Sequence, residues 1–232
     1  MLTPLPRPAG STGQPAVLTS AAQRTDAALL LYQQALAVDP DNPEALSNLG
    51  FLLTQFGQLE AGIPCLEHAL RVRPEFPEAS LNLGNALIAQ GRLDEAIRSF
   101  RLALQARPGF DAAGDCLGNA LVSVGRTDEA IAQYRETLRL HPDFVDARIN
   151  LGTALVRAGR LPEAITVYEA ALAQAPARAE AHNNLGFALL RLGRFDAAIA
   201  RFQRALELNP DYTTARNNLA LARSEAQKAA AP

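Results

Sequence analysis

Identical residues return every 34 positions along most of this chain, and this period constrains the fold more than any other feature. Prolines follow it at Pro40, Pro74, Pro108, Pro142, Pro176 and Pro210. Leu-Gly pairs follow it from residues 49–50 to 185–186, and Leu219-Ala220 stands at the next place. A second glycine series comprises Gly57, Gly91, Gly125, Gly159 and Gly193. Three series with one period indicate an array of stacked structural repeats.

Each period contains two helical stretches, as residues 77–110 illustrate. Apolar residues recur there at offsets of three and four, the spacing of one helix face. Gly91 separates the two stretches, because glycine accepts the left-handed backbone conformation that ends helices. Asp94 is the predicted N-cap of the second helix, and Pro108 closes the unit. The sequence therefore predicts an all-α protein built from antiparallel helix pairs.

The repeated pattern resembles the tetratricopeptide repeat, which combines a Leu-Gly pair, an Ala-x3-aromatic pair and a closing proline on 34 residues. The Ala-x3-aromatic pairs are Ala96…Phe100, Ala130…Tyr134, Ala164…Tyr168 and Ala198…Phe202. The tryptophan that this family carries near the start of a unit is missing. The resemblance implies an α-solenoid, a right-handed superhelix of helix pairs.

The period predicts five complete units, 43–76, 77–110, 111–144, 145–178 and 179–212. Residues 21–42 match only the second helix of a unit, since Gly10, Gly13 and Pro15 break the first helix that residues 9–22 would form. Residues 213–228 match only a first helix, and their polar side chains predict a cap on the stack. We expect residues 1–20 to be a flexible leader and residues 229–232 to be a tail.

Composition excludes several classes of protein. The 22 Lys and Arg residues against 24 Asp and Glu leave a net charge of -2, without the basic surplus of a nucleic-acid binder. No apolar run approaches the roughly 20 residues that span a bilayer, and the N-terminus lacks a signal-peptide core. Cys65 and Cys116 fit neither a disulfide framework nor a zinc site. We therefore expect a cytoplasmic protein with two reduced thiols, no membrane contact and no nucleic-acid partner.

No combination of residues predicts catalysis. Three histidines occupy different unit positions without metal-ligand spacing: His68, His141 and His182. Nucleophile elbows, phosphate loops and dinucleotide fingerprints are missing from the sequence. The pairs Asp94-Glu95 and Asp128-Glu129 begin helices, and adjacent residues do not face each other there. We expect no enzyme, and hence no catalytic residue, no metal and no cofactor.

The sixth residue of each unit forms a polar series. In proteins that this sequence resembles, that position faces a concave groove lined by the first helices. It is asparagine in five of six cases, with Cys116 as the exception: Asn48, Asn82, Asn150, Asn184 and Asn218. We call these five residues the asparagine ladder, and two nearby asparagines, Asn85 and Asn119, are predicted to line the same groove.

An asparagine amide offers a donor and an acceptor, as a peptide bond does. Neighbouring helix pairs lie about 10 Å apart, and an extended peptide advances about 3.3 Å per residue. One asparagine per unit can therefore hold about every third residue of an extended ligand. The alternative is that duplication passed on solvated asparagines with no ligand to bind.

Other predicted groove residues set the character of the ligand. Six acids contribute negative charge: Glu44, Glu78, Asp115, Asp146, Glu180 and Glu225. Arg157 and Arg191 reduce the net charge of the lining to -4, and Phe51 and Phe187 add apolar contacts. We expect a protein or peptide ligand that is partly basic and partly apolar. Several of these acids lie near helix starts, however, where they also suit the helix dipole.

The strings 82–87 and 91–97 are similar to the superhelical repeats of O-linked N-acetylglucosamine transferases. This resemblance implies that the asparagine ladder holds a substrate backbone, and a transferase role would require a catalytic portion outside this chain. The clamp of chaperone-tail-binding repeats needs basic residues, but acids stand at two of its positions, namely Asp146 or Asp115 at one and Glu180 at the other. A ligand held by its terminal carboxylate is therefore disfavoured.

Three functions follow from these observations. The residues favour a non-catalytic scaffold that binds an extended peptide or partner segment in its groove. The first alternative is the substrate-recruiting portion of a glycosyltransferase. The second is a structural scaffold that assembles end to end through its incomplete terminal units.

Overall fold

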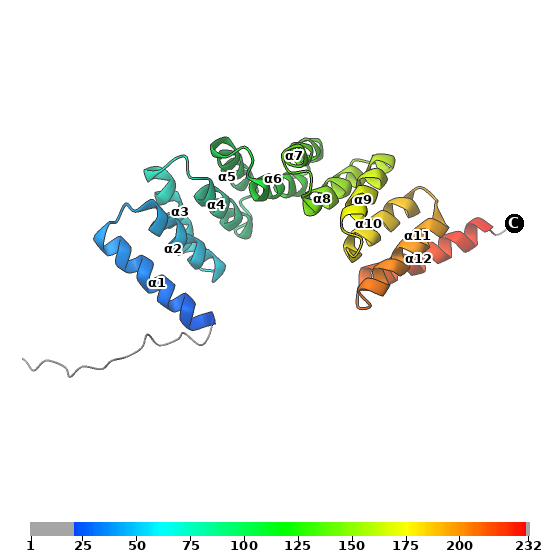
Figure 1. The fold of residues 1–232 in the computed structure, drawn as a ribbon, viewed down its shortest axis with the longest axis horizontal. Coiled ribbons are helices and arrows are strands. Elements are labelled where there is room, and N and C mark those ends of the chain that lie inside the picture. Colours follow the sequence, from blue (N-terminus) through cyan, green and yellow to red (C-terminus); the bar gives the residue numbers. More distant parts are fainter. Residues whose placement is uncertain (1–20, 231–232) are drawn as a thin grey trace, which may run out of the picture.

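The computed structural model describes residues 21–230, with side chains from residue 27 onward. The predicted leader and the last two residues of the predicted tail lie outside the described residues. Within them the chain forms twelve α-helices and no strand, arranged as an arch with α1 at one end and α12 at the other (Figure 1).

The helices alternate along the chain as the 34-residue period predicts. The N-terminal helix is α1 (Ala21–Val38) and the C-terminal helix is α12 (Thr213–Ala230). The first helices of the pairs between them are α2 (Pro43–Gln55), α4 (Pro77–Ala89), α6 (Asp111–Ser123), α8 (Val145–Arg157) and α10 (Ala179–Arg191). The second helices are α3 (Leu59–Val72), α5 (Leu93–Ala106), α7 (Thr127–Leu140), α9 (Leu161–Gln174) and α11 (Phe195–Leu208). The predicted all-α solenoid is confirmed, whereas the exact division into units stays a prediction.

Glycine makes the turn inside each complete pair. The five turn glycines have φ between 72° and 80°, a region that other residues enter at a cost: Gly57, Gly91, Gly125, Gly159 and Gly193. Gln227 occupies the corresponding place in α12. Without a turn glycine, α12 continues to 18 residues, where α10 has 13.

The predicted N-cap at Asp94 is wrong. Helix α5 begins at Leu93, and its N-cap residue is Arg92, whose side chain makes no capping hydrogen bond. The turn after Gly91 contains only one more residue, so the helix begins too early for Asp94 to cap it. Asp94 lies in the first turn, where its charge still suits the helix dipole.

A glycine and a ring meet at the centre of four helix pairs. A Cβ added at Gly84 would lie 2.3 Å from Phe100 Cε1, so only glycine allows this approach. The same contact joins Gly118 to Tyr134, Gly152 to Tyr168 and Gly186 to Phe202. All four rings are at most 1% exposed. These contacts hold the two helices of a pair close together and form the centre of the core.

The first helices line the inside of the arch (Figure 1). Each of them contacts the first helix of the neighbouring pair, from α2 to α12. The backbones of successive second helices lie farther apart within the described residues, where long side chains bridge the gap, as in the ion pairs of Arg101 with Glu129 and of Arg135 with Glu163. Because one layer is closely spaced and the other is spread, the solenoid curves toward the first helices and makes that face concave.

Candidate functional site

The asparagine ladder lies at one register on successive first helices, with members on α2, α4, α8, α10 and α12. Asn48 is exposed, and the other four members are half-buried. The structure therefore brings the predicted ladder to the concave layer of the solenoid. Its role in binding stays a prediction.

Several ladder amides have partners within the protein, although we expected them to be free for a ligand. Asn150 Nδ2 donates to Asp115 Oδ1 at 2.8 Å, and Asn218 Nδ2 donates to Asn183 Oδ1 at 3.0 Å. Asn183 Nδ2 in turn donates to Asn184 Oδ1 at 3.1 Å. Asn150 and Asn218 thus each bond the fifth residue of the preceding unit, 35 positions earlier. Part of the ladder joins neighbouring first helices to each other.

Asp115 is the centre of the larger network. Its second carboxylate oxygen, Oδ2, accepts a hydrogen bond from Asn119 Nδ2 at 3.0 Å. Asn119 Oδ1 accepts from the Tyr134 hydroxyl at 2.7 Å. Both Asp115 oxygens and both polar atoms of Asn119 are therefore engaged, which favours a structural role for two residues that we expected to contact the ligand. The same register in the next pair holds Thr153, whose hydroxyl lies 3.0 Å from that of Tyr168 and was missed from the sequence.

Burial raises the pKa of the Asp115 carboxyl, which the amides of Asn150 and Asn119 only partly offset. An acid whose pKa is raised by folding binds more protons in the folded state, so its contribution to stability falls as pH rises above its ordinary value of about 3.9. Asp115→Asn keeps only one of the two acceptor oxygens, but its stability relative to the wild type should be higher at about pH 7 than at about pH 3.5. Urea unfolding at the two pH values measures this difference.

The chain offers a reverse variant for the same prediction. Asn183 holds the position of Asp115 two units later and makes the corresponding bond to Asn218. Asn183→Asp introduces a buried carboxylate there and should destabilise the protein more at neutral than at acid pH. Equal effects of either variant at both pH values would contradict a desolvated charge at this position.

The predicted acidity of the groove is largely balanced by ion pairs. Glu44 pairs with Arg73 at 2.7 Å and Glu78 with Arg107 at 2.6 Å. Two further pairs are Asp146 with Arg178 and Glu225 with Lys228. Arg73 and Arg107 directly follow the second helix of the same pair and reach back to the start of its first helix, whereas Arg178 is the N-cap residue of α10 and reaches back to the start of α8. Counting only the first helices therefore overstated the negative charge of this face.

The remaining predicted residues differ in their surroundings. The guanidinium of Arg191 lies 5.9 Å from the centre of the Phe187 ring, close enough for a cation–π contact. Arg157 is exposed, and Phe51 is 39% exposed. Phe51 therefore presents an aromatic surface on the concave side of α2.

A pocket of about 90 Å³ opens between α2 and α4 and brings three predicted residues together: Phe51, Asn82 and Asn85. The other lining residues are Thr54, Gln55, Leu59, Ala86 and Ala89. Neither Asn82 nor Asn85 makes a side-chain hydrogen bond within the described part of the chain. This pocket thus combines an aromatic wall with amide groups that are free to bind.

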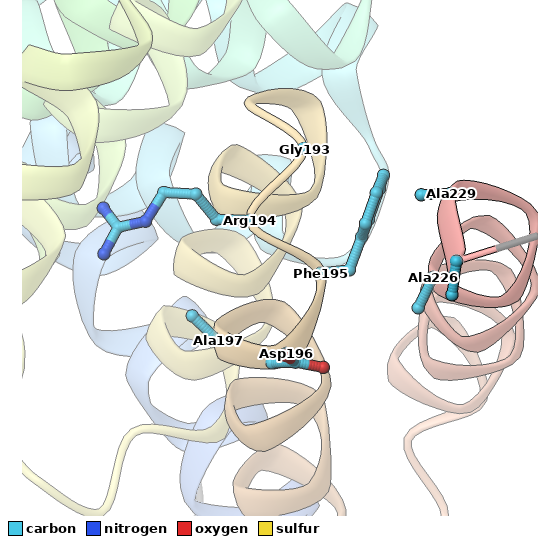
Figure 2. A pocket seen from close by; sticks show the side chains of 8 residues that line it. Gly193, Arg194, Phe195, Asp196, Ala197, Ala226 and Ala229 are labelled. Carbon is cyan, nitrogen blue, oxygen red and sulfur yellow. The ribbon is translucent and has the colours of Figure 1, made fainter. Parts of the chain in front are cut away.

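A wider hollow of about 500 Å³ lies at the C-terminal end (Figure 2). The Phe195 ring faces Ala226 and Ala229 there, while Arg194 points away to the other side. The hollow forms where α12 continues past the place of the usual turn. Alanines and turn residues dominate its lining, and no ladder residue takes part. The α2–α4 pocket is therefore the better candidate site.

The sequence matches models of a known protein family along most of the array. Models described as tetratricopeptide repeat match residues 52–109, 117–179, 150–211 and 183–231, and a TPR repeat model matches residues 21–55. The chain belongs to the tetratricopeptide repeat (TPR) family. A comparison with curated proteins found no match.

Solved TPR structures share the fold. YrrB, a TPR protein with an unusual peptide-binding site, is 23% identical, with a TM-score of 0.68 over 80% of this chain and 96% of its own. MamA from Desulfovibrio magneticus RS-1 is 23% identical, with a TM-score of 0.68 over 74% and 97% of the two chains. TTC0263, a thermophilic TPR protein of Thermus thermophilus, is 23% identical, with a TM-score of 0.60 over 78% and 98%. At this identity the likeness establishes the fold alone.

The histidine, cysteine and acidic residues of the TPR array do not form a metal site within residues 21–230. No group of three His, Cys, Asp or Glu residues in this range is placed to hold a metal ion. Both cysteines are free thiols, and burial raises the pKa of Cys116 to about 11. None of the helices in this range is both long and apolar enough to pass through a bilayer.

Proposed function

We propose that this TPR protein is a non-catalytic scaffold that binds an extended peptide along its concave face. The observation that carries the proposal is the α2–α4 pocket, where Phe51 lies beside the unengaged amides of Asn82 and Asn85. An aromatic wall suits an apolar side chain, and an asparagine amide suits the donor and acceptor of a peptide bond. The peptide would thus be held by its backbone and anchored by one apolar residue.

The proposal divides the asparagine ladder into two parts. Asn48 and Asn82, toward the N-terminal end, would contact the ligand directly. Asn150 and Asn218 donate to partners within the protein, which leaves their carbonyl oxygens as the atoms for a ligand N–H. A peptide that follows the groove would therefore be held most strongly near α2 and α4.

The ion pairs of the first-helix acids change the expected charge of the ligand. Because Glu44, Glu78 and Asp146 each have an arginine partner, the concave face offers little free negative charge. We therefore propose a ligand whose apolar residues matter more than its basic ones. Rim charges contribute mainly to association rate and salt dependence, so the affinity should depend weakly on salt.

A random-peptide phage library, selected on the full chain, provides the test. Binding of a selected peptide should weaken in the double variant Asn82→Ala/Asn85→Ala by about 5- to 150-fold, because two lost hydrogen bonds together cost about 1–3 kcal/mol. Fluorescence anisotropy of the labelled peptide measures the change. Phe51→Ala should weaken the same peptide through loss of the apolar contact.

Asn217→Ala is the matched control, since Asn217 is an exposed asparagine on α12 away from the pocket. It should leave the affinity unchanged. If the selected peptides bind all variants equally, the groove proposal is wrong. Selection of no peptide at all would also count against it.

The two alternatives gain little support. No feature of residues 21–230 favours the glycosyltransferase alternative over a peptide-binding scaffold. End-to-end assembly requires the two terminal helices to fit each other, and their residues oppose such a fit, as described below. We retain a cytoplasmic location as part of the proposal, supported by the two free thiols.

A further inference from the structure

Helix α1 matches the second helix of a unit, and no first helix precedes it among the described residues. Among the described helices it contacts only α2. Ala28 and Ala35 of α1 hold the same unit positions as Ala96 and Ala103 of α5, which are fully buried. On α1, by contrast, Ala35 is exposed and Ala28 is only half-buried. No described helix therefore covers the side of α1 on which a first helix would pack, and we call this side open.

The open side is a stripe of uncharged residues at heptad spacing. It comprises Ala28, Leu31, Ala35 and Val38, with Leu31 63% and Val38 88% exposed. No charged residue occurs between Ala27 and Val38. A helix that is apolar on nearly all sides is usually buried by other parts of a protein. An apolar stripe that stays exposed on such a helix marks an interaction surface.

The other end of the solenoid is a poor partner for this stripe. In complete pairs the ring of the second helix packs on a glycine, as Phe100 does on Gly84. Tyr32 is the corresponding ring of α1, but Ala220 replaces the glycine in α12. A Cβ at that register would meet the ring at less than 3 Å, as it would in all four ring-containing pairs. The exposed charges of Arg216 and Arg223 on α12 oppose the contact further.

The chain ahead of α1 is also a poor occupant. A missing first helix would have to come from residues 9–22, where Gly10, Gly13 and Pro15 disfavour a helix. A better occupant is a helix with an apolar stripe of the same length. A second copy of α1 meets that requirement.

The stripe is complementary to itself. When two copies are antiparallel about a two-fold axis at residue 33, Leu31 faces Ala35 of the other copy, and Ala28 faces Val38. Each layer then joins a small side chain to a large one, which is how facing helices interdigitate. An antiparallel partner also has the direction of the missing first helix, because the two helices of a TPR pair are antiparallel.

We propose that α1 is a homodimer interface, in which the stripes of two chains pack antiparallel about a two-fold axis. Such an isologous contact closes after two copies and cannot grow into a filament. The dimer would complete the open end of each solenoid and leave both concave faces free. It is independent of peptide binding, so either proposal can fail alone.

Sedimentation velocity of the full chain, over low to high micromolar concentration, is the first test. The wild type should convert from a 24.8 kDa monomer to a species of twice that mass. Leu31→Lys should stay monomeric, because the lysine would face Ala35 of the partner in a dry interface. Leu31 is mostly exposed in the monomer, so the variant should keep the helix content of the wild type by circular dichroism.

Leu221→Lys is the matched control, since Leu221 is a 48% exposed leucine on the opposite terminal helix. It should dimerise as the wild type does. A second test uses the register itself: Leu31→Lys and Ala35→Glu should each be monomeric alone but should form a heterodimer when mixed. Only the mixture places the introduced lysine of one chain against the introduced glutamate of the other. The native contact between Leu31 and Ala35 is then kept on the other side of the axis.

Each other outcome overturns the proposal. A wild type that is monomeric at every concentration means that α1 is open or covered by its own chain. Masses that grow past the dimer mean end-to-end assembly. A dimer that survives Leu31→Lys, or is lost in Leu221→Lys, means that the copies meet elsewhere. Failure of the mixed variants to associate means that the antiparallel register is wrong.

Discussion

Replacing Phe100 by alanine should lower the free energy of unfolding by about 3–5 kcal/mol. The ring is 1% exposed and fills the space against Gly84, so its loss leaves a cavity between α4 and α5. These helices sit inside the array, and a solenoid depends on contacts between neighbours. Urea unfolding followed by circular dichroism measures the change.

The control for this variant is Phe51→Ala, which removes the same ring from an exposed site on the concave face. It should change stability by no more than about 1 kcal/mol. Amide hydrogen exchange adds location to the result, because protection in Phe100→Ala should fall first in α4 and α5. Equal losses for the two phenylalanines would contradict the packing described for the helix pairs.

The second large effect should follow Gly152→Val, which we expect to cost about 3 kcal/mol, the upper end of the range for overpacked cores. A Cβ at Gly152 would lie 2.5 Å from Tyr168 Cε1. The ring has little freedom to move, because it is buried and its hydroxyl lies 3.0 Å from Thr153 Oγ1. Thermal unfolding should show a clear fall in the melting temperature.

Ala220→Val tests the same substitution type on α12, which has no following second helix within residues 21–230. Ala220 is exposed on α12 at the register of the core glycines, so the only cost is the lower helix propensity of valine, a few tenths of a kcal/mol. A similar loss in both variants would mean that valine disturbs the helix itself. The difference between the two stability losses also measures how much tighter the packing at this position is inside a helix pair than on α12.

The fold was predictable because its signal is repeated. Gly91 predicts a left-handed turn, and the same glycine returns in every complete pair with φ near 75°. The approach of Gly84 to Phe100 follows from a small residue and a ring at fixed places in each unit. Periodicity averages over local exceptions, so the missing tryptophan does not obscure the pattern.

The site was less predictable, because its decisive contacts join residues 29 to 35 positions apart. Asn150 was expected to be free, and the partner that engages it, Asp115, lies on the preceding first helix. Glu44 was counted as a free charge although Arg73 neutralises it from the end of the same pair. Such pairings depend on the angle between stacked helices, which composition and periodicity do not specify.

The hydrogen bonds between first helices also have a mechanical consequence. Asn150 and Asn218 are anchored to the preceding first helix, which resists changes in curvature between α6 and α8 and between α10 and α12. Between α2 and α4 the corresponding residues are Ser47 and Asn82, and no side-chain bond joins them among the described contacts. The same positions carry no such bond between α4 and α6 or between α8 and α10 among the described contacts. The arch should therefore bend more easily at these three junctions, one of which lies beside the pocket that holds Phe51. A ligand could therefore adjust the width of that pocket without breaking a hydrogen bond between first helices.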